Sequence, residues 1–324
     1  MEQSEFQFIE ELRNRFKFNS FVGKGIGDDC AVIPYTDEES YIITSDNLVE
    51  DIHFNLDTIS YKSLGWKSIA VNLSDIASMG GIPRYIFISI AIPKKHSSKD
   101  ISCFYDGVEK IIKQYNVMLL GGDTTGSSNK LFVSITAIGI AKTNKILYRK
   151  GAKEDDNIYV TGSIGDSSAG LFLINTNQAS ENENNKKLID KHLLPMPRIN
   201  EMIYLNDKYK IHSSIDISDG LLSDLSHILN ENKLGAIIEW NRIPISDELK
   251  NNIPENEIEN IVLNGGEDYE ILFTSPEKIN VNELFKKTNI LLSCIGKIYT
   301  SQGITLIKDN EREIVIPKGF DHFV

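Results

Sequence analysis

Residues 23–34 read GKGIGDDCAVIP, so that three glycines lead into two adjacent aspartates and then into an apolar run. Two carboxylates about 4 Å apart repel each other by about 4 kcal/mol at an effective dielectric constant of about 20. A surface turn tolerates one such pair in water, whereas a repeated pattern of acidic turns requires a cation. The apolar run predicts a strand, and Cys30 at its start is interpreted as a buried core residue.

Acidic residues recur at turns along the chain, and glycine lies beside four of the five turns. The residues are Asp28 and Asp29, Asp46, Asp123, Asp216 and Asp219, and Glu267 and Asp268. Strand ends beside glycine are where α/β proteins bind ligands, because the backbone can approach closely there. Each turn taken alone also has a structural explanation, since aspartate favours turns and helix N-caps. For Asp219 the structural alternative is a cap on a helix that begins at Gly220, and Asp224 is interpreted as a solvated helix residue.

A predicted helix over residues 61–79 adds a sixth acidic position to the five acidic turns. Its polar residues Ser68, Asn72 and Asp75 fall at i, i+4 and i+7 and therefore share one face. Because the rest of the helix is rich in small and apolar residues, we expect Asp75 to point into a cleft. The alternative is that Asp75 only forms a hydrogen bond with a neighbouring turn.

Together, these acidic positions predict a site for a hard cation. Oxygen ligands without clusters of histidine or cysteine favour Mg²⁺ or Ca²⁺ over zinc. Calcium is disfavoured, because the sequence has no D-x-D-x-D-G loop with a trailing glutamate. Magnesium held by few carboxylates is typical of phosphate chemistry. The stretch GKGIG fits neither GxxxxGK[ST] nor GxGxxG, so a bound nucleotide would require another architecture.

The composition limits the class of protein. A chain of 324 residues predicts two domains, and a net charge of −12 argues against a nucleic-acid partner. Three cysteines without a CxxC pair fit a reducing cytosol rather than a disulfide framework. The acidic N-terminal stretch does not resemble a signal peptide, and no apolar run has the length of a membrane span. We therefore expect a cytoplasmic protein without a membrane partner.

The periodicity predicts two mixed halves. In the first half we expect helices over residues 5–17, 61–79 and 98–115, and strands over 41–47, 84–93, 117–123 and 130–141. A charged, strand-poor stretch follows at 143–156, so the predicted domains are residues 1–145 and 146–324. In the second half we expect a strand over 158–166, a strand–turn–helix over 213–229, a turn and strand over 262–274, and three short terminal strands. The polar stretch 176–187 is interpreted as a surface loop without a function.

The ordered set of segments resembles a known family. The segments are GIGDDCAVI, TSDNLVEDIHF, GWKSIAVNLSDIASMGG, GGDTTG, RKGAKEDDNIYVTGSIGDSSAGL, HLLPMPRI, SSIDISDGLLSDL, LNGGEDYEILF and KGFDHF. They span nearly the whole chain and resemble thiamine-monophosphate kinase, of the AIR-synthetase-like (PurM-like) ATP-binding superfamily. Each segment alone is weak evidence for this family, whereas the full set in this order is specific to it.

The resemblance implies a fold, an assembly and a reaction. The fold would be a two-domain PurM-like α/β (α+β) fold, in which the N-terminal mixed sheets of two subunits join into a barrel in a homodimer. The reaction would be transfer of the γ-phosphoryl group of ATP to thiamine monophosphate, which gives thiamine diphosphate and ADP. Several Mg²⁺ ions would align the two phosphates for direct in-line transfer. Because the attacking phosphate oxygen is already ionised near pH 7, no general base or covalent nucleophile is expected.

The resemblance also implies roles for individual residues. The magnesium ligands would be Asp29, Thr44, Ser45, Asp46, Asp75, Asp123, Asp216 and Asp219, with Asp28 either a ligand or a supporting residue. The ATP contacts would be Tyr105, Gly122, Asp123, Arg149 and Ser218. The thiamine phosphate contacts would be His53, Glu267 and Phe320. Phe320 replaces the tryptophan of some family members, which puts the affinity for thiamine in question.

Alternatives to these roles remain open at this stage. His53 would otherwise be a polar loop residue, Tyr105 a core or rim aromatic, and Phe320 a residue that covers a core edge. A purine-pathway cyclo-ligase or a selenophosphate synthetase is the nearest rival enzyme. The latter usually carries a reactive cysteine near a glycine-rich segment, whereas Cys30 follows the aspartates here. A non-catalytic metal- or nucleotide-binding scaffold is the rival from another class.

Overall fold

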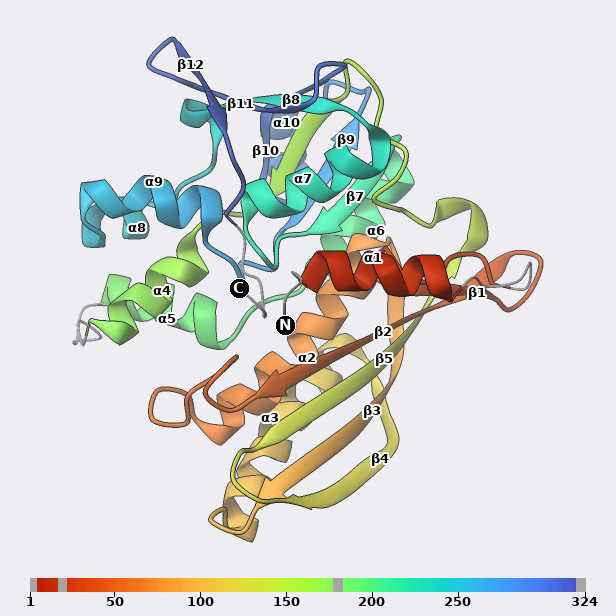
Figure 1. Ribbon diagram of the computed structural model, residues 1–324, viewed down its shortest axis with the longest axis vertical. Helices are drawn as coiled ribbons and strands as arrows, with labels where there is room; N and C mark the ends of the chain where they lie inside the picture. The colour runs from red at the N-terminus through yellow and green to blue at the C-terminus, as the bar shows by residue number, and fades with distance from the viewer. Residues whose placement is uncertain (1–4, 17–21, 177–182, 319–324) are drawn as a thin grey trace.

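The computed structural model describes residues 5–16, 22–176 and 183–318, and it contains two β-sheets with helices packed on them (Figure 1). The first sheet has the order β1-β2-β5-β3-β4. Only β3 and β4 pair in parallel. Its strands are β1 (Ala31–Pro34), β2 (Glu39–Val49), β3 (Ile82–Pro93), β4 (Met118–Ser127) and β5 (Phe132–Lys142).

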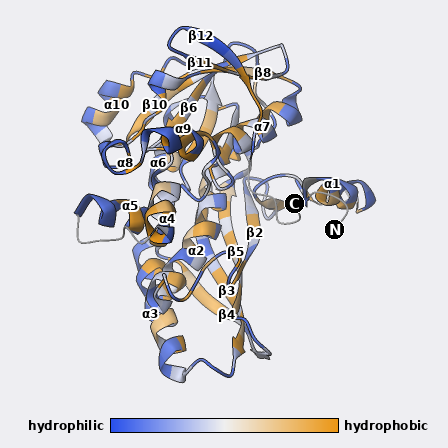
Figure 2. Ribbon diagram, turned by 60° about the vertical axis from the view of Figure 1, so that its left-hand side comes forward, coloured by the Kyte–Doolittle hydropathy of each residue, from blue (hydrophilic) through white to orange (hydrophobic). Residues whose placement is uncertain are grey.

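Two helices, α2 (Tyr61–Ser78) and α3 (Ser98–Tyr115), cover one face of this sheet. They approach closely at two glycines, because a Cβ on Gly65 would lie 2.0 Å from the carbonyl oxygen of Phe104 and one on Gly107 would lie 1.9 Å from that of Lys62. Figure 2 shows both helices on one side of the strands; of the described helices, only α1 (Glu5–Arg15) lies toward the other side, near the second half of the molecule.

The first sheet therefore has an open face and an open edge. Strand β4 forms the edge, and nearly all of its residues are exposed. Exposed large apolar residues gather there, namely Phe87 on β3 and Met118, Leu119 and Leu120 on β4. An apolar sheet face with an unpaired edge strand is typical of a surface that another chain covers.

The second sheet has seven strands in the order β12-β11-β8-β10-β6-β9-β7. Its strands are β6 (Asn157–Thr161), β7 (Ser213–Asp216), β8 (Gly235–Glu239), β9 (Ile271–Ser275), β10 (Leu292–Tyr299), β11 (Gly303–Lys308) and β12 (Glu311–Val315). The remaining helices are α1 (Glu5–Arg15), α4 (Asp166–Asn175), α5 (Glu183–Leu193), α6 (Ile199–Lys208), α7 (Leu221–Asn232), α8 (Asp247–Asn252), α9 (Glu255–Asn264) and α10 (Val281–Thr288). The single 3₁₀ turn η1 (Thr143–Lys145) lies between β5 and β6, and η2 (Trp240–Arg242) lies between β8 and α8.

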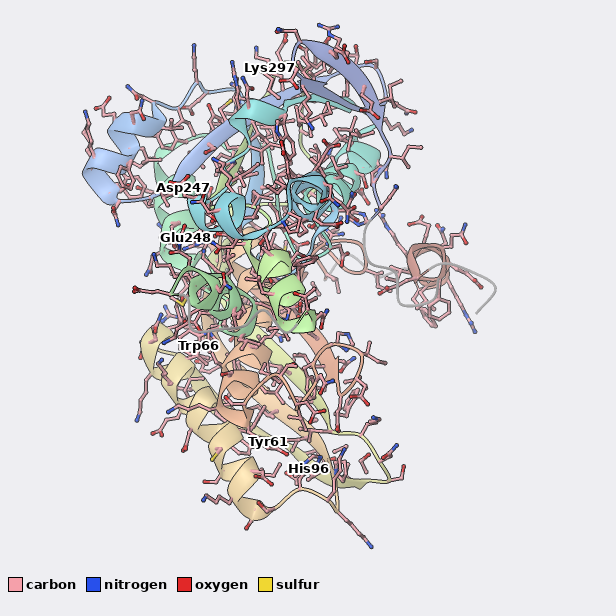
Figure 3. All side chains as sticks on the ribbon, turned by 90° about the vertical axis from the view of Figure 1, so that its left-hand side faces the viewer. Tyr61, Trp66, His96, Asp247, Glu248 and Lys297 are labelled. Atoms are coloured by element: carbon pink, nitrogen blue, oxygen red, sulfur yellow. The ribbon has the colours of Figure 1, made fainter. Side chains whose placement is uncertain are left out.

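Helix α2 joins the two halves of the molecule. Helix α6 packs on it with Ile199, Met202 and Leu205, which belong to the same apolar cluster as the core of the first sheet. The Nε1–H group of Trp66 donates a hydrogen bond of 2.8 Å to the carbonyl oxygen of Pro195. At the end of the first half that lies away from the second sheet, the hydroxyl of Tyr61 lies 2.6 Å from Nδ1 of His96 (Figure 3).

Most predicted elements are confirmed to within a few residues, including helices α2 and α3 and the three short terminal strands β10–β12. The interpretation of Cys30 as a buried core residue is also confirmed. The surface loop predicted over residues 176–187 is wrong at its end, because α5 begins at Glu183. Asn185, Leu188 and His192 of α5 are buried, so a few core-facing positions stabilise a helix whose composition is polar.

The first sheet ends at Lys142 and the second begins at Asn157. The domain boundary between residues 145 and 146 stays a prediction. Within residues 5–16, 22–176 and 183–318, no helix is long and apolar enough to span a membrane.

Candidate active site

A cavity of about 1120 Å³ lies between the two halves and gathers most of the predicted site residues. The predicted residues that line it are Asp29, Thr44, Ser45, Asp46, His53, Asp75, Arg149, Asp216, Ser218, Asp219 and Glu267. They come from the segment before β1, from β2 and the loop after it, from α2, from the segment before β6, from the end of β7 and the turn to α7, and from the loop before β9. The expectation that Asp75 points into a cleft is therefore confirmed.

Helix α2 organises the carboxylates through the polar face that its sequence predicts. Asn72 accepts a hydrogen bond of 3.2 Å from the backbone N–H of Asp46 on β2. One turn further on, Asp75 accepts a hydrogen bond of 2.5 Å from the hydroxyl of Thr44. Ser74 donates a hydrogen bond of 2.7 Å to Asp216 of the second sheet. One helix thus holds acidic residues from both halves around one cavity.

The carboxylates in this cavity disfavour each other's ionised form. Burial raises the pKa of Asp46 to about 6, and the neighbouring charges of Asp29 and Asp219 add to this shift. Burial also raises the pKa of Asp75 and Asp216 well above the usual value, and nearby carboxylates contribute in both cases. Carboxylate and hydroxyl oxygens are the ligands that Mg²⁺ prefers, and a bound cation would remove the repulsion. The residues present therefore fit magnesium.

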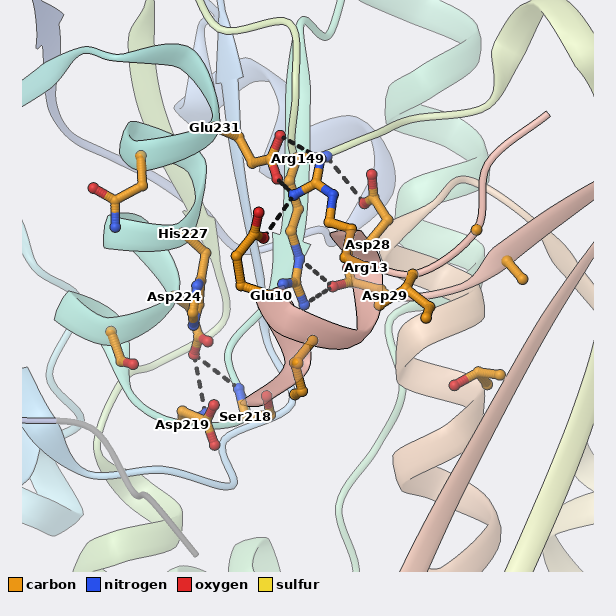
Figure 4. Close-up of a pocket in the computed structure, with 18 of the residues that line it drawn as sticks. Glu10, Arg13, Asp28, Asp29, Arg149, Ser218, Asp219, Asp224, His227 and Glu231 are labelled. Carbon is orange, nitrogen blue, oxygen red and sulfur yellow. Dashed lines mark hydrogen bonds and ion pairs between the residues drawn. The ribbon is translucent and has the colours of Figure 1, made fainter. Parts of the chain in front are cut away.

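The paired aspartates of residues 28 and 29 have different partners. Asp29 accepts hydrogen bonds of 2.8 and 2.5 Å from the guanidinium of Arg149 (Figure 4). Asp28 lies 3.1 Å from Nζ of Lys24 and accepts a hydrogen bond of 3.1 Å from the backbone N–H of Arg149. Burial, followed by the charge of Asp29, raises the pKa of Asp28. The repulsion between these two carboxylates is thus reduced, because the cationic groups of Arg149 and Lys24 lie beside them.

A second cavity of about 1340 Å³ adjoins the first between α1 and α7. Asp29, Arg149 and Ser218 line both cavities. An ion pair of 2.5 Å between Arg13 of α1 and Glu231 of α7 lies along this second cavity (Figure 4). The two cavities together give enough room for two ligands that meet at the acidic residues.

The shape of the turn before α7 depends on Asp224, for which the prediction of a solvated side chain is wrong. Asp224 is not solvated but buried, and it accepts hydrogen bonds of 3.0, 3.1 and 3.1 Å from the backbone N–H groups of Ser218, Asp219 and Gly220. Ligand atoms of Asp219, Asp224 and His227 also lie within 4.8 Å of one another. The position of Asp224 in the first turn of a predicted helix was the available signal, since carboxylates there satisfy free N–H groups.

The segment GGEDYE uses its acidic residues for different purposes. Asp268 accepts hydrogen bonds of 2.6 and 3.0 Å from the backbone N–H groups of Gly165 and Ser167 at the start of α4. Glu270 is buried and accepts hydrogen bonds from Arg198, one of them 2.6 Å long. Glu267, by contrast, lines the first cavity.

The two described residues predicted to contact thiamine phosphate lie in the same cavity. Glu267 lines it together with His53. Nδ1 of His53 accepts a hydrogen bond of 3.1 Å from the backbone N–H of Val49, so a neutral His53 carries its proton on Nε2. Phe320, the third predicted contact, lies outside the described residues.

Three predicted residues lie away from both cavities within this chain. Asp46, Ile135, Ile88 and Gly122 are successive partners across β2, β5, β3 and β4. At about 4.8 Å per strand, Gly122 and the adjacent Asp123 lie about 14 Å from Asp46. Tyr105 on α3 packs edge-on against Phe104, with 5.4 Å between ring centroids. Their roles stay predictions.

Comparison with known proteins decides the family. The description "AIR synthase related protein, N-terminal domain" matches residues 27–141, and "AIR synthase related protein, C-terminal domain" matches residues 153–309. The thiamine-monophosphate kinase of Buchnera aphidicola subsp. Schizaphis graminum is 42% identical over 100% of this chain and 100% of that protein. The Escherichia coli K12 thiamine-monophosphate kinase is 36% identical over 98% of each chain.

The chain belongs to the thiamine-monophosphate kinase family. A solved structure described as AaThiL complexed with AMPPCP and TMP is similar to it, with a TM-score of 0.86 and 31% identity over 99% of this chain and 98% of that one. The predicted two-domain PurM-like α/β fold is therefore confirmed for this member of the thiamine-monophosphate kinase family. The resemblance stated from its sequence motifs is confirmed as well.

Proposed function

We propose that this chain transfers the γ-phosphoryl group of ATP to thiamine monophosphate and releases thiamine diphosphate and ADP. The main support for this proposal is a single cavity in which acidic residues of both halves lie together with His53 and Glu267. The names of the relatives and the AMPPCP and TMP of the similar AaThiL structure support the same reaction.

Magnesium fits the acidic end of the cavity. The residues that would hold it are Asp29, Thr44, Ser45, Asp46, Asp75, Asp216 and Asp219. When bound, it would neutralise the two anionic substrates and allow their phosphates to approach each other.

The side chains of the protein position the reactants rather than react with them. Arg149 presents a guanidinium at the junction of the two cavities, where a donor to phosphate oxygens is needed. Asp224 holds the turn of Ser218 and Asp219 in one shape. The attacking phosphate oxygen is already ionised near pH 7, since the second pKa of a phosphate monoester is about 6. We therefore propose direct in-line transfer without a general base and without a phosphoenzyme.

The open sheet supports the proposal of a homodimer. The exposed apolar residues of β3 and β4 provide the face on which a second copy can pack, with the two sheets forming the intersubunit barrel. Because Asp123 lies too far from Asp46 to share an ion within one chain, we propose that Asp123 of the partner subunit completes each site. Gly122 and Tyr105 would then reach the nucleotide from the same partner.

The direct test is a coupled assay for ADP release with ATP and Mg²⁺, run with and without thiamine monophosphate, combined with chromatography for thiamine diphosphate. We expect ADP and thiamine diphosphate to appear together, and only when both acceptor and metal are present. ATP binding without transfer would instead indicate another acceptor of the same superfamily. Absence of nucleotide binding would support a scaffold that does not catalyse.

The absence of a phosphoenzyme has its own test. Incubation with γ-labelled ATP alone is expected to leave no label on the protein. Label retained on the denatured chain would contradict direct transfer.

A further inference from the structure

Helix α2 buries a lysine ammonium at the boundary between the two halves. The side chain of Lys67 is only 1% exposed, and its neighbours on the helix are mostly apolar. Burial of an unpaired ammonium is costly, so such a lysine requires a partner. The partner is Glu267, whose Oε1 lies 2.9 Å from Nζ of Lys67.

The two members of this ion pair differ in their access to the cavity. The side chain of Glu267 is 30% exposed, in contrast to the 1% of Lys67. Both residues line the cavity, but the carboxylate is the more accessible of the two groups, so the pair presents mainly an anion to a ligand. This asymmetry distinguishes the pair from an ordinary surface salt bridge, in which both groups face water.

The backbone at Glu267 is fixed by its surroundings. Glu267 has a φ of +65°, a left-handed conformation that is unfavourable for a side chain of this kind. Its N–H donates a hydrogen bond of 2.7 Å to the carbonyl oxygen of Ser218. A Cβ on the preceding Gly266 would lie 2.4 Å from the same oxygen, so only glycine allows the two backbone segments to approach this closely. The direction of the carboxylate then depends on what it contacts.

A buried histidine contacts the other carboxylate oxygen without supplying charge. Nδ1 of His192 lies 3.4 Å from Oε2 of Glu267. Burial, followed by the charge of Lys67, lowers the pKa of His192 to about 4, so His192 is neutral near pH 7. Burial alone would raise the pKa of Glu267, but contacts with positively charged groups lower it below its usual value. The largest of these opposing contributions is the ammonium of Lys67.

We propose that Lys67 is a positioning residue for the acceptor substrate: it keeps Glu267 ionised and directed into the cavity, where the carboxylate attracts the cationic ring of the acceptor. This inference rests on the proposed function, because the thiazolium ring of thiamine monophosphate carries a permanent positive charge. Lys67 and Glu267 both line the cavity, but the side chain of Lys67 is only 1% exposed, so it acts on the acceptor mainly through Glu267. Its effect is therefore specific to the affinity for the acceptor.

The test compares Lys67→Met with Lys67→Arg in the full-length enzyme. Lys67→Met is expected to raise KM for thiamine monophosphate by about 10- to 100-fold, because loss of a buried partner disorganises the remaining charge. KM for ATP is expected to change by less than about threefold, because the variant leaves the acidic turns intact. Lys67→Arg keeps the positive charge and is expected to restore most of the affinity for the acceptor.

Two further variants make the result specific. Lys62→Met removes an exposed lysine from the first turn of the same helix and is expected to leave both KM values unchanged. The double variant Glu267→Gln with Lys67→Met is expected to have the same KM for the acceptor as Glu267→Gln alone. The reason is that Glu267→Gln already removes the carboxylate that Lys67 positions. Melting temperatures of all variants identify any that fail to fold. If Lys67→Met does not fold, the KM values of Lys67→Arg are compared with those of the wild type instead.

The outcomes separate this inference from the proposed function. If the wild type phosphorylates thiamine monophosphate and Lys67→Met has an unchanged KM for it, the role of Lys67 is wrong and the function stands. The same holds if both KM values rise equally, which a general loss of structure would produce. If the wild type itself does not phosphorylate thiamine monophosphate, both proposals are wrong.

Discussion

Thr44 donates a hydrogen bond of 2.5 Å to Asp75 and thereby ties strand β2 to helix α2 at the acidic end of the cavity. This contact holds a carboxylate close to Asp46, the next acidic residue along β2. The two carboxylates repel each other, and Asp46 is the second-largest cause, after burial, of the raised pKa of Asp75. Such an arrangement costs stability in the metal-free protein and becomes favourable only with a bound cation.

Replacement of Asp46 by asparagine tests this balance between stability and function. Asp46→Asn is expected to lower kcat by at least about 100-fold, because a positioned charge in a transition-state site is lost. The metal-free melting temperature is expected to stay the same or rise, since the repulsion disappears. The increase in melting temperature that Mg²⁺ with an ATP analogue gives the wild type is expected to shrink.

The matched control is Asp57→Asn, which removes an exposed carboxylate outside the cavity. It is expected to behave like the wild type in every one of these measurements. Near-normal turnover of Asp46→Asn would show that this residue is not a ligand.

A mixing experiment tests whether Asp123 acts from the partner subunit. Asp46→Asn and Asp123→Asn are each expected to be nearly inactive alone. In a mixed dimer, one site would carry both changes and the other would carry neither. Random reassociation makes half of the dimers mixed, so about a quarter of the wild-type activity is expected to return.

The same mixture would also show if Asp123 does not act from the partner subunit. If Asp123 acted within its own chain, every site of a mixed dimer would carry one change, and activity would not return. Size-exclusion chromatography with light scattering, before and after exchange of subunits, measures whether dimers form at all.

The sequence predicts what depends on local pattern. The polar face of α2 followed from spacings of three and four residues, and the acidic turns followed from glycine beside aspartate. Their convergence on one cavity did not follow from these patterns, because it depends on packing between distant elements. The family resemblance was needed to place Asp29, Asp46 and Asp216 in one site.

Contacts between distant residues were missed for the same reason. Lys67 and Glu267 are 200 positions apart, and no periodicity relates a helix of one half to a loop of the other. The distance between Asp46 and Asp123 depends on strand order and register, which single-strand patterns do not contain. Asp224 differs, since its hydrogen bonds are local, and attention to the first turn of the helix would have identified it.

Removal of the Asp224 carboxylate is expected to affect stability and nucleotide binding together. Asp224→Ala leaves three backbone N–H groups without their acceptor, and this is expected to lower the free energy of unfolding by about 3 kcal/mol. The turn that carries Ser218 would lose its shape, so KM for ATP is expected to rise. Urea denaturation and steady-state kinetics measure the two effects.

Asp247→Ala provides the control for Asp224→Ala, because its side chain is 92% exposed in the first turn of α8. It is expected to change the free energy of unfolding by less than about 0.5 kcal/mol. A stable Asp224→Ala variant with an unchanged KM for ATP would mean that the turn keeps its shape without Asp224.

The buried histidine of α5 makes the stability of the fold depend on pH. Burial lowers the pKa of His192 to about 4 from an ordinary value of 6.5, and the charge of Lys67 adds to the shift. As the pH falls below 6.5, the unfolded chain binds a proton at His192 while the folded chain does not. The stabilising contribution of neutral His192 is therefore complete near pH 7, falls as the pH decreases, and is lost at about pH 4.

Replacement of His192 by glutamine isolates this contribution. Between pH 7.5 and pH 5, the free energy of unfolding of the wild type is expected to fall by about 2 kcal/mol more than that of His192→Gln. Other groups titrate in both proteins and cancel in the difference. Urea denaturation at both pH values measures it, and equal losses in the two proteins would mean that His192 takes up its proton in the folded state.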